Sequence, residues 1–389
     1  MQNFVFQNPV RIVFGKQTIQ KLDELIAADE RILILYGGNS ARSNGTLDEV
    51  KSALGQRSVW EFGGIEPNPT YETLMRAVEA VRREKITFLL AVGGGSVIDG
   101  TKFVAAAVNF PGEPWQILEN MGRNVTSAMP FGTVLTLPAT GSEMNNGAVI
   151  TRKATQSKLP FLSDHVFPRF SILDPSKTFS LPVRQVANGI VDSFVHTLEQ
   201  YLTYPAGGMV QDRFAEGLLQ TLIEIGPQTL AAPQDYDLRA NLMWVATLAL
   251  NGLIGAGVPQ DWATHMLGHE LTARFGIDHA RTLAAILPAA MQVRRDAKRE
   301  KLLQYAERVW KITDGSEDER IDEAIRQTAM FFESLGVLTK LSAYDVKPDE
   351  IPSVLDQLAA HGTDKLSERM DMTLDTHARI LQLSLQGEQ

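Results

Sequence analysis

Three observations predict that an α/β domain with a parallel sheet precedes an all-helical domain. The chain has 389 residues, which is long enough for two domains of typical size. Up to about residue 180, short β-rich runs alternate with helical segments, and from about Pro182 onward only helical patterns remain. We therefore expect an α/β domain over 1–180 and a helical domain over 181–389, with the boundary near Ser180 in the segment DPSKTFSLP.

The expected strands are apolar on both faces, a pattern typical of a parallel sheet that is covered by helices on both sides. These strand-like runs begin at Arg11, Arg31, Ser58, Thr87, Thr133, Ala148 and Phe170. The expected helices of the second half cover residues 184–203, 210–224, 239–253, 259–275, 298–312 and 319–335.

Composition and charge exclude several classes of function. The net charge is −9 and no long Lys/Arg run occurs, so the chain offers no basic field to nucleic acid or to a membrane surface. We find no signal-peptide pattern and no apolar run of membrane-spanning length, and we therefore expect a cytoplasmic enzyme. The absence of cysteine excludes thiolate chemistry, so any metal must be held by histidines and carboxylates.

The segment FLLAVGGGSVIDG carries the first candidate ligand site. An apolar strand leads into Gly93–Gly95, and Ser96 opens a helix. Glycines let backbone N–H groups approach an anion, and a helix N-terminus adds free donors, so we expect a diphosphate-like ligand here. The alternative is a turn without a ligand in which Ser96 and Asp99 form a capping box. The template Gly-x-Gly-x-x-Gly does not fit, because Ile98 stands where its last glycine would be.

Two further polar turns follow apolar strands. The turn after RILILY is Gly37–Ser40, and the first acid beyond it is Asp48. In sites that select NAD an acid near this strand end accepts the ribose 2′-hydroxyl, whereas a 2′-phosphate needs donors, which Asn39, Ser40 and Arg42 could supply. The alternative is a plain strand-to-helix turn. The turn in TLPATGSEMNNGAV either contacts a nicotinamide or is merely a loop, and its polar residues are Thr140, Ser142 and Asn145.

Five side chains of the second half form a candidate metal site. In VANGIVDSFVHTLEQYL, Asp192 and His196 are four residues apart and share one helix face. His265 and His269 repeat this spacing on another helix, and His279 is expected in the loop after Gly276. One aspartate and several histidines are typical ligands of a single divalent ion, although the first helix alone would also suit a buried Asp–His hydrogen bond. Because about four ligands suffice, one of the five has another role.

Taken together, these segments resemble a known family. GGGSVIDGTK, TLPATGSE, ANGIVDSFVHTLEQY and HMLGHELTARFGIDHARTLAAILP are similar to the signature segments of the iron-containing alcohol dehydrogenases, and the match covers essentially the whole chain. Within this family the chain most closely resembles the branch of NADPH-dependent aldehyde reductases and butanol dehydrogenases. The resemblance implies a Rossmann-like N-terminal domain, a helical C-terminal domain of the dehydroquinate synthase-like type, and a cleft between them.

The resemblance also assigns residues. It implies that Asp192, His196, His265 and His279 bind one divalent ion, Zn²⁺ or Fe²⁺, and that His269 is a catalytic residue near the nicotinamide. Gly94, Gly95 and Ser96 would hold the pyrophosphate of NADP(H). The expected cofactor site comprises Gly37, Gly38, Asn39, Ser40, Asn68, Gly94, Gly95, Ser96, Asp99, Thr136, Thr140, Ser142, Asn145 and Lys158.

The expected reaction is hydride transfer between the nicotinamide and a small aldehyde or alcohol on the metal. His269 would relay the proton or only orient the site. One alternative is an NAD- and metal-dependent lyase of the dehydroquinate synthase type, which usually has Glu as its first ligand where this chain has Asp192. The other is a metal-dependent hydrolase, which would leave the glycine turns unexplained. The family further implies a homodimer, and the N-terminal FVFQNPVRIVF could form a pair of strands that extends a sheet across it.

Overall fold

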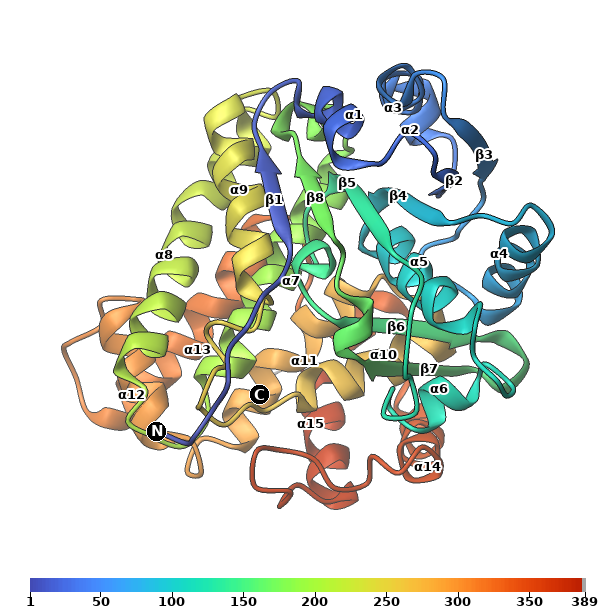
Figure 1. Ribbon diagram of the computed structural model, residues 1–389. Helices are drawn as coiled ribbons and strands as arrows, with labels where there is room; N and C mark the ends of the chain where they lie inside the picture. Colours follow the sequence, from blue (N-terminus) through green and yellow to red (C-terminus); the bar gives the residue numbers. More distant parts are fainter. Residues whose placement is uncertain (387–389) are drawn as a thin grey trace. The chain divides into compact units, whose positions relative to one another are not determined.

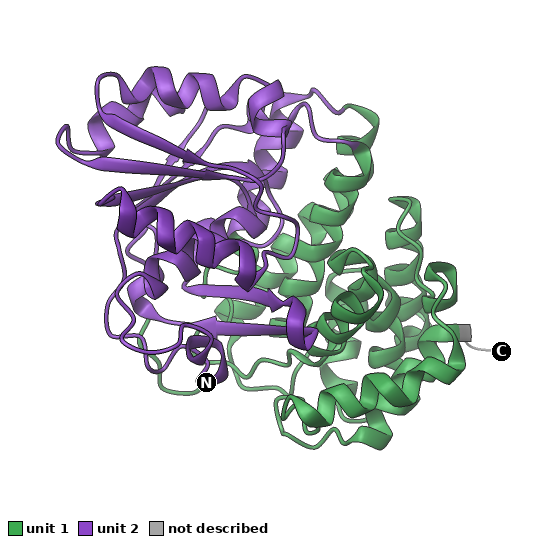
Figure 2. Cartoon of the chain, turned by 90° about the vertical axis from the view of Figure 1, so that its right-hand side faces the viewer, with its two compact units in different colours: residues 1–6, 183–232, 248–389 green, residues 7–182, 233–247 purple. Residues whose placement is uncertain are grey.

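The computed structural model describes residues 1–386 and divides them into two units (Figures 1 and 2). The sheet unit consists of Gln7–Pro182 and Pro233–Thr247, and the helical unit consists of Met1–Phe6, Val183–Ala232 and the chain from Leu248 onward. The main change of unit therefore lies two residues from the expected boundary. Two short segments lie outside the expected domains: Met1–Phe6 belongs to the helical unit, and Pro233–Thr247 belongs to the sheet unit. A division of the sequence into two continuous halves does not anticipate these exchanges.

Local contacts explain both exchanged segments. In the sheet unit, Trp244 packs edge-on against Phe14 at 6.0 Å between ring centroids, and Thr247 donates a hydrogen bond of 2.5 Å to Glu143. In the helical unit, the backbone N–H of Gln2 donates to the carbonyl of Gly257 at 2.8 Å. Single contacts of this kind leave no periodic pattern in the sequence.

Six parallel strands form the main sheet in the order β1-β8-β5-β4-β2-β3. The chain first moves outward from β2 to β3, then returns past β2 to β4 and continues in the opposite direction. The strand order therefore reverses between β2 and β4, which are direct neighbours. The strands are β1 (Arg11–Phe14), β2 (Arg31–Tyr36), β3 (Ser58–Phe62), β4 (Phe88–Gly94), β5 (Phe131–Leu137) and β8 (Phe170–Leu173).

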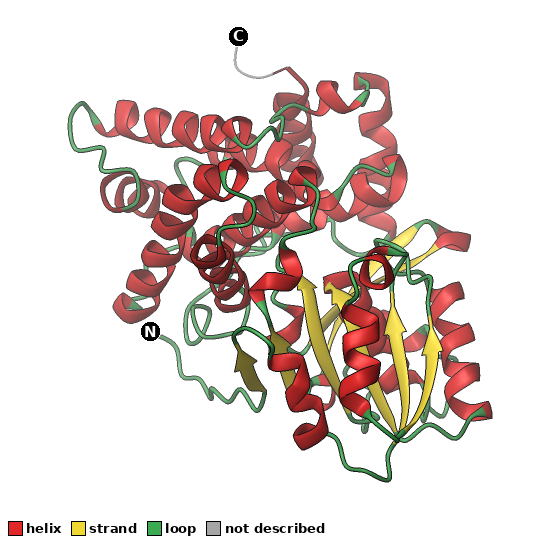
Figure 3. Cartoon of the chain, turned by 90° about the horizontal axis from the view of Figure 1, so that it is seen from above, coloured by secondary structure: helices red, strands yellow, loops and turns green. Residues whose placement is uncertain are grey.

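Alternate residues of the central strands feed two separate cores, one on each face of the sheet. Leu89 and Ala91 of β4 belong to one core, together with residues of α4 (Tyr71–Arg83) and α5 (Gly95–Ala107). Leu90 and Val92 belong to the other core, together with residues of α1 (Leu22–Leu25) and α3 (Thr46–Leu54). The prediction of a parallel sheet that is covered on both faces is confirmed (Figure 3).

Two expectations about strands are wrong. AVIT from Ala148 is not part of the main sheet, because β6 (Gly147–Arg152) pairs antiparallel with β7 (Ser157–Leu162) in a separate hairpin. The partner β7 was not anticipated, since Pro160 within it argues against a strand. In the N-terminal FVFQNPVRIVF only Arg11–Phe14 is a strand, so the expected pair of strands is absent from this part of the described chain.

The helical unit contains only helices among its regular elements up to residue 386, as predicted. Two helices differ from expectation because they contain a proline: α8 continues through Pro227, and α11 contains Pro288. No helix of residues 1–386 combines the length and apolar character needed to span a bilayer. The longer helices of this unit are α7 (Val183–Tyr201), α8 (Met209–Ala231), α10 (Ala263–Phe275), α11 (His279–Val293), α12 (Arg299–Arg308), α13 (Glu317–Ser334), α14 (Ile351–Ala360) and α15 (Leu374–Gln386). Helix α9 (Tyr236–Ala249) belongs mostly to the sheet unit.

Candidate metal and dinucleotide site

Helices α7, α10 and α11 bring the predicted metal ligands together in the helical unit. Asp192 and His196 lie one turn apart on α7, and His265 lies in the first turn of α10. His279 is the first residue of α11 and not a loop residue as expected, although it still follows the end of α10 directly. Asp192, His196 and His265 are each at most 5 % exposed, so this polar cluster is shielded from bulk water.

The distances suit a shared ion. One ligand atom from each of Asp192, His265 and His279 lies within 4.8 Å of the other two. His196 is not part of this group of three, but its Nδ1 lies 3.8 Å from Asp192 Oδ1, and its ring stacks on that of His265 at 4.5 Å. Asp192 Oδ1 is buried and has no hydrogen-bond partner among residues 1–386. A buried carboxylate oxygen without a donor is costly, and a cation would compensate it.

Glu199, one further turn along α7, orients His265. Its Oε2 accepts a short hydrogen bond from His265 Nδ1, and its Oε1 accepts the backbone N–H groups of Thr264 at 2.7 Å and His265 at 3.3 Å. This leaves Nε2 of His265 on the side of Asp192, at 4.0 Å from Oδ1. Burial and the nearby charge of Asp261 raise the pKa of the Glu199 carboxyl well above its usual value. A carboxylate behind a ligating imidazole is the arrangement that fixes ring orientation in metal sites.

Two aromatic side chains border the cluster. His269 lies one turn after His265, with its ring 4.9 Å from that of His279 and 6.2 Å from that of His265. Trp262 lies edge-on to His265 at 5.3 Å and thereby forms an apolar wall beside the candidate ligands. His269 therefore lies next to the candidate ligands His265 and His279.

In the sheet unit, two of the predicted glycine turns meet at the point where the strand order reverses. Tyr36 of β2 pairs with Val92 of β4, so Gly37–Ser40 and Gly93–Ser96 leave the same edge of the sheet side by side. In open parallel sheets, ligands bind at the carboxyl ends of the strands at such a reversal. Helix α5 starts here with Gly94 as its N-cap and without a side-chain cap, so its first N–H groups are available to an anion.

The three consecutive glycines are required by packing inside the unit. A Cβ at Gly93 would lie 2.5 Å from Val97, and a Cβ at Gly95 would lie 2.3 Å from Thr140 Oγ1. At Gly38, in contrast, a Cβ would meet no atom within 4 Å. Packing alone therefore accounts for the Gly93–Gly95 run, and the features that favour an anion here are the reversal of strand order and the uncapped start of α5.

The loop after β5 is held to α5 by buried polar contacts. Asp99 accepts hydrogen bonds from Ser142 Oγ at 2.6 Å and from the N–H of Val149 at 2.9 Å, so the alternative of a Ser96–Asp99 capping box is wrong. Lys102 is fully buried and donates to Asn145 Oδ1 at 2.8 Å. Burial lowers the pKa of Lys102 to about 8. These contacts favour a role for Asp99 and Asn145 in fixing the loop over direct contact with a cofactor.

Comparison with known proteins decides the family. The model of iron-containing alcohol dehydrogenases matches residues 9–175, and the model of the C-terminal region of Fe-containing alcohol dehydrogenases matches residues 186–383. The chain belongs to the iron-containing alcohol dehydrogenase family. It is therefore an oxidoreductase, and the lyase alternative is not favoured.

Members of this family resemble the chain over nearly its full length. The NADPH-dependent aldehyde reductase YqhD of Escherichia coli is 62 % identical over 382 residues, which is 98 % of this chain and 99 % of the relative. The crystal structure of E. coli YqhD aligns with a TM-score of 0.98 at 60 % identity and covers 98 % of this chain and 99 % of that chain. A probable NADH-dependent butanol dehydrogenase of Bacillus subtilis is 39 % identical and covers 93 % of this chain and 95 % of the relative.

Of the remaining predicted cofactor residues of this family member, Asn68 and Thr136 lie near the same sheet edge, whereas Lys158 belongs to the separate hairpin. Asn68 adopts a left-handed backbone conformation with φ of 56°, and its N–H donates to Ser96 Oγ at 3.3 Å. Thr136 is near the end of β5, and Lys158 is a buried residue of β7. Phe161 of β7 lies in the core of the sheet unit.

Sequence reasoning missed two features of the site. Glu199 follows Asp192 by seven residues and His196 by three, a spacing that places all three on one helix face and could have revealed it. Glu61 of β3 could not be found in this way, because it reaches the turn after β2 from a neighbouring strand. Its carboxylate pairs with Arg42 at 3.1 Å and with Lys51 at 3.3 Å, so Arg42 is already engaged within the unit.

Proposed function

We propose that this chain is a metal-dependent, NADP(H)-linked aldehyde reductase that interconverts small aldehydes and alcohols. The observation that carries the proposal is the cluster of buried Asp192, buried His265 and half-buried His279 in one unit, together with two glycine turns at the strand reversal of the other. YqhD, which is named as an NADPH-dependent aldehyde reductase, supports the reaction class.

The donor set fits one divalent ion, Zn²⁺ or Fe²⁺. Asp192, His196, His265 and His279 would hold it, and buried Asp192 Oδ1, which otherwise has no hydrogen-bond partner in residues 1–386, would gain a cation. When bound, the ion polarises the carbonyl of the substrate. Glu199 keeps the His265 ring in place by accepting from its Nδ1, and Trp262 excludes water from one side of the cluster.

The turns at the strand reversal fit a dinucleotide. Gly94, Gly95 and Ser96 would hold the pyrophosphate at the uncapped start of α5, and the exposed turn Gly37–Ser40 would receive the ribose phosphate. The reduced nicotinamide supplies the hydride. Glu61 would repel a 2′-phosphate, but its ion pairs with Arg42 and Lys51 offset its charge. This arrangement supports a preference for NADP(H) over NAD(H).

His269 is the proposed source of the proton that the product oxygen needs. Its imidazole lies beside His265 and His279 but is not one of the proposed ligands, so it can act as a proton donor to the product oxygen. If His269 only orients its neighbours, His269→Gln will lower turnover without changing the shape of the pH profile. If it relays the proton, the same variant will remove one limb of that profile.

We further propose that the enzyme is a homodimer in the cytoplasm. Several apolar side chains of the helical unit are exposed on the N-terminal segment and on the start of α8, which suits burial against a second copy. The large exposed residues of these two segments are Met1, Phe4, Val5, Phe6, Met209, Val210 and Phe214. Light scattering of the purified chain should give about twice the mass of 42.9 kDa.

Turnover with a simple aldehyde tests the function. The protein, loaded with Zn²⁺ or Fe²⁺ and mixed with NADPH and butanal, should consume the near-ultraviolet absorbance of the reduced nicotinamide. His265→Ala serves as the matched control, since it removes one proposed ligand. A metal-loaded protein that leaves NADPH unchanged with every small aldehyde tried would overturn the proposal.

A further inference from the structure

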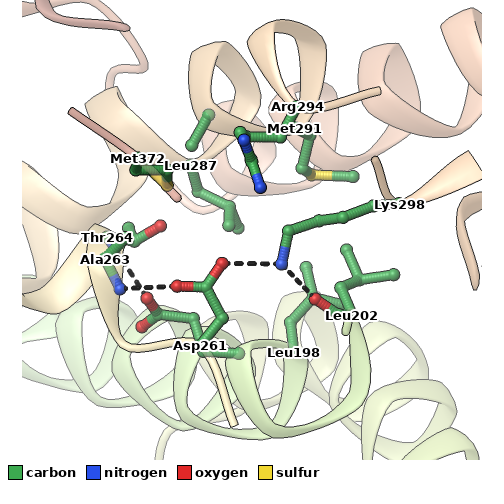
Figure 4. A pocket seen from close by; sticks show the side chains of 12 residues that line it. Leu198, Leu202, Asp261, Ala263, Thr264, Leu287, Met291, Arg294, Lys298 and Met372 are labelled. Atoms are coloured by element: carbon green, nitrogen blue, oxygen red, sulfur yellow. Dashed lines mark hydrogen bonds and ion pairs between the residues drawn. The ribbon is translucent and has the colours of Figure 1, made fainter. Parts of the chain in front are cut away.

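A buried lysine lies behind the candidate metal cluster. Lys298, just before α12, is only 7 % exposed. Its Nζ contacts the carbonyl oxygen of Leu202 and, at 2.6 Å, Asp261 Oδ2 (Figure 4). A third contact joins Nζ to Glu368 Oε2 at 3.5 Å. The close-up shows the side chain of Lys298 reaching directly toward Asp261 and Leu202. None of these residues was singled out by sequence analysis.

The two strongest of these contacts join the helices that carry the ligands. Leu202 is the first residue after α7, which carries Asp192 and His196. Asp261 lies two residues before the start of α10, which carries His265 in its first turn. One ammonium group therefore ties the end of one ligand helix to the beginning of the other.

Asp261 and Glu199 together cap the start of α10. Asp261 Oδ1 accepts the N–H of Ala263 at 2.9 Å, Glu199 Oε1 accepts the N–H groups of the next two residues, and the N–H of Asp261 donates to the Glu199 carbonyl at 2.9 Å. The residue at the N-cap position, Trp262, makes no side-chain cap. The position of the first turn of α10, and with it the backbone of His265, thus depends on two neighbouring carboxylates.

These carboxylates need the cation of Lys298. Without it, Asp261 would be a buried charge next to Glu199, and an uncompensated buried charge is strongly unfavourable. The wall of a cavity of about 30 Å³ beside Lys298 includes both carboxylates and the apolar side chains of Leu198 and Met372. The carboxylates therefore have space into which they can shift. Loss of the ion pair would therefore be relieved by displacement of Asp261 and of the helix start that it caps.

We propose that Lys298 is a positioning residue for the metal site, which holds the ends of α7 and α10 in the arrangement that binds the ion. The inference rests on the proposed ligand set. It predicts that Lys298 sets metal affinity although it touches none of the ligands, because it acts through Asp261 and the first turn of α10.

Competition for Zn²⁺ against a chromophoric chelator tests this with the full chain. Replacement of groups behind metal ligands typically weakens binding by 10–100-fold, so Lys298→Met should raise the Kd for Zn²⁺ by at least about tenfold. The matched control is Lys301→Met, which removes another buried ion pair three residues later, with Asp212 at 2.6 Å. Lys301 lies over the ring of Tyr201 at the end of α7, 3.9 Å from its centroid, but it has no contact with the start of α10 in the described structure. Because the proposed effect runs through Asp261 and the first turn of α10, this control should keep the wild-type Kd.

Two further variants complete the design. Lys298→Arg retains the cation and should bind Zn²⁺ more tightly than Lys298→Met. If Lys298→Met does not fold, Asp261→Asn replaces it, since Asn keeps an oxygen for the Ala263 N–H but loses the charge, and it should weaken Zn²⁺ binding in the same way. Equal Kd values for wild type, Lys298→Met or Asp261→Asn, and Lys301→Met would overturn this inference alone. A wild-type chain that binds no Zn²⁺ would overturn the proposed ligand set and the inference with it.

Discussion

Replacement of Gly38 by Asp should reverse the choice of cofactor. Gly38 is exposed in the turn after β2, and a Cβ there would meet no atom within 4 Å. Its φ lies outside the left-handed region, so a larger residue should fit without strain. The substitution therefore tests charge at this turn with little disturbance of the fold.

The magnitude follows from simple electrostatics. A carboxylate about 6 Å from a phosphate of charge about −1.5 is repelled by about 2 kcal/mol at an effective dielectric constant of about 40, roughly thirtyfold in binding. We expect the wild type to prefer NADPH by at least about tenfold in kcat/KM, or about 1.4 kcal/mol. A tenfold preference would become a preference for NADH of about threefold, and a bond from the new carboxylate to the ribose would increase it.

Steady-state kinetics with both cofactors and one aldehyde provide the measurement. Gly38→Asn is the matched control, because Asn has the size of Asp without its charge and should retain most of the NADPH preference. Equal use of both cofactors by the wild type, or an unchanged ratio in Gly38→Asp, would show that the turn after β2 does not discriminate between them.

Three other outcomes are expected. Metal analysis of purified variants should find His265→Ala depleted of metal and His269→Ala fully loaded but slow; full occupancy in His265→Ala would refute the ligand assignment. In urea denaturation, Gly95→Ala should lose about 1–3 kcal/mol because its Cβ would overlap Thr140, whereas Gly38→Ala should change little. The hydrogen bond with a buried glutamate raises the pKa of His361, so the stabilisation that His361→Gln removes should be largest below about pH 6.5 and vanish as pH rises through the raised pKa. A loss of stability that is the same at all pH values would contradict it.

Features with a local signature could be predicted from the sequence. The apolar runs of β2, β4 and β8 identify buried strands, and the spacing of Asp192 and His196 places both on one face of α7. Where a proline interrupts such a signature, prediction fails. Pro288 conceals α11, so His279 was expected in a loop, and Pro160 conceals β7.

Features that depend on strand order or on burial could not be predicted in this way. Two glycine turns were recognisable, but only the return of the chain past β2 to β4 places them next to each other. Lys298 lies in the charged segment RRDAKREK, which is typical of a solvated surface, and yet it is buried. A sequence records which residues are charged, whereas their desolvation is decided by partners distant in the chain.

Both units use a buried lysine behind the elements that would contact ligands. Lys102 donates to Asn145 Oδ1 and to the carbonyl of Gly147, and so holds the loop after β5 against α5. Lys298 holds the ends of α7 and α10 through Leu202 and Asp261. Apolar side chains in place of such a lysine and its partners together would cost no stability, but they would not hold polar groups of two elements in a fixed arrangement. Because each ammonium joins two segments of different elements, the expected effect of its removal is a displaced ligand-binding element, and hence weaker binding, more than an unfolded chain.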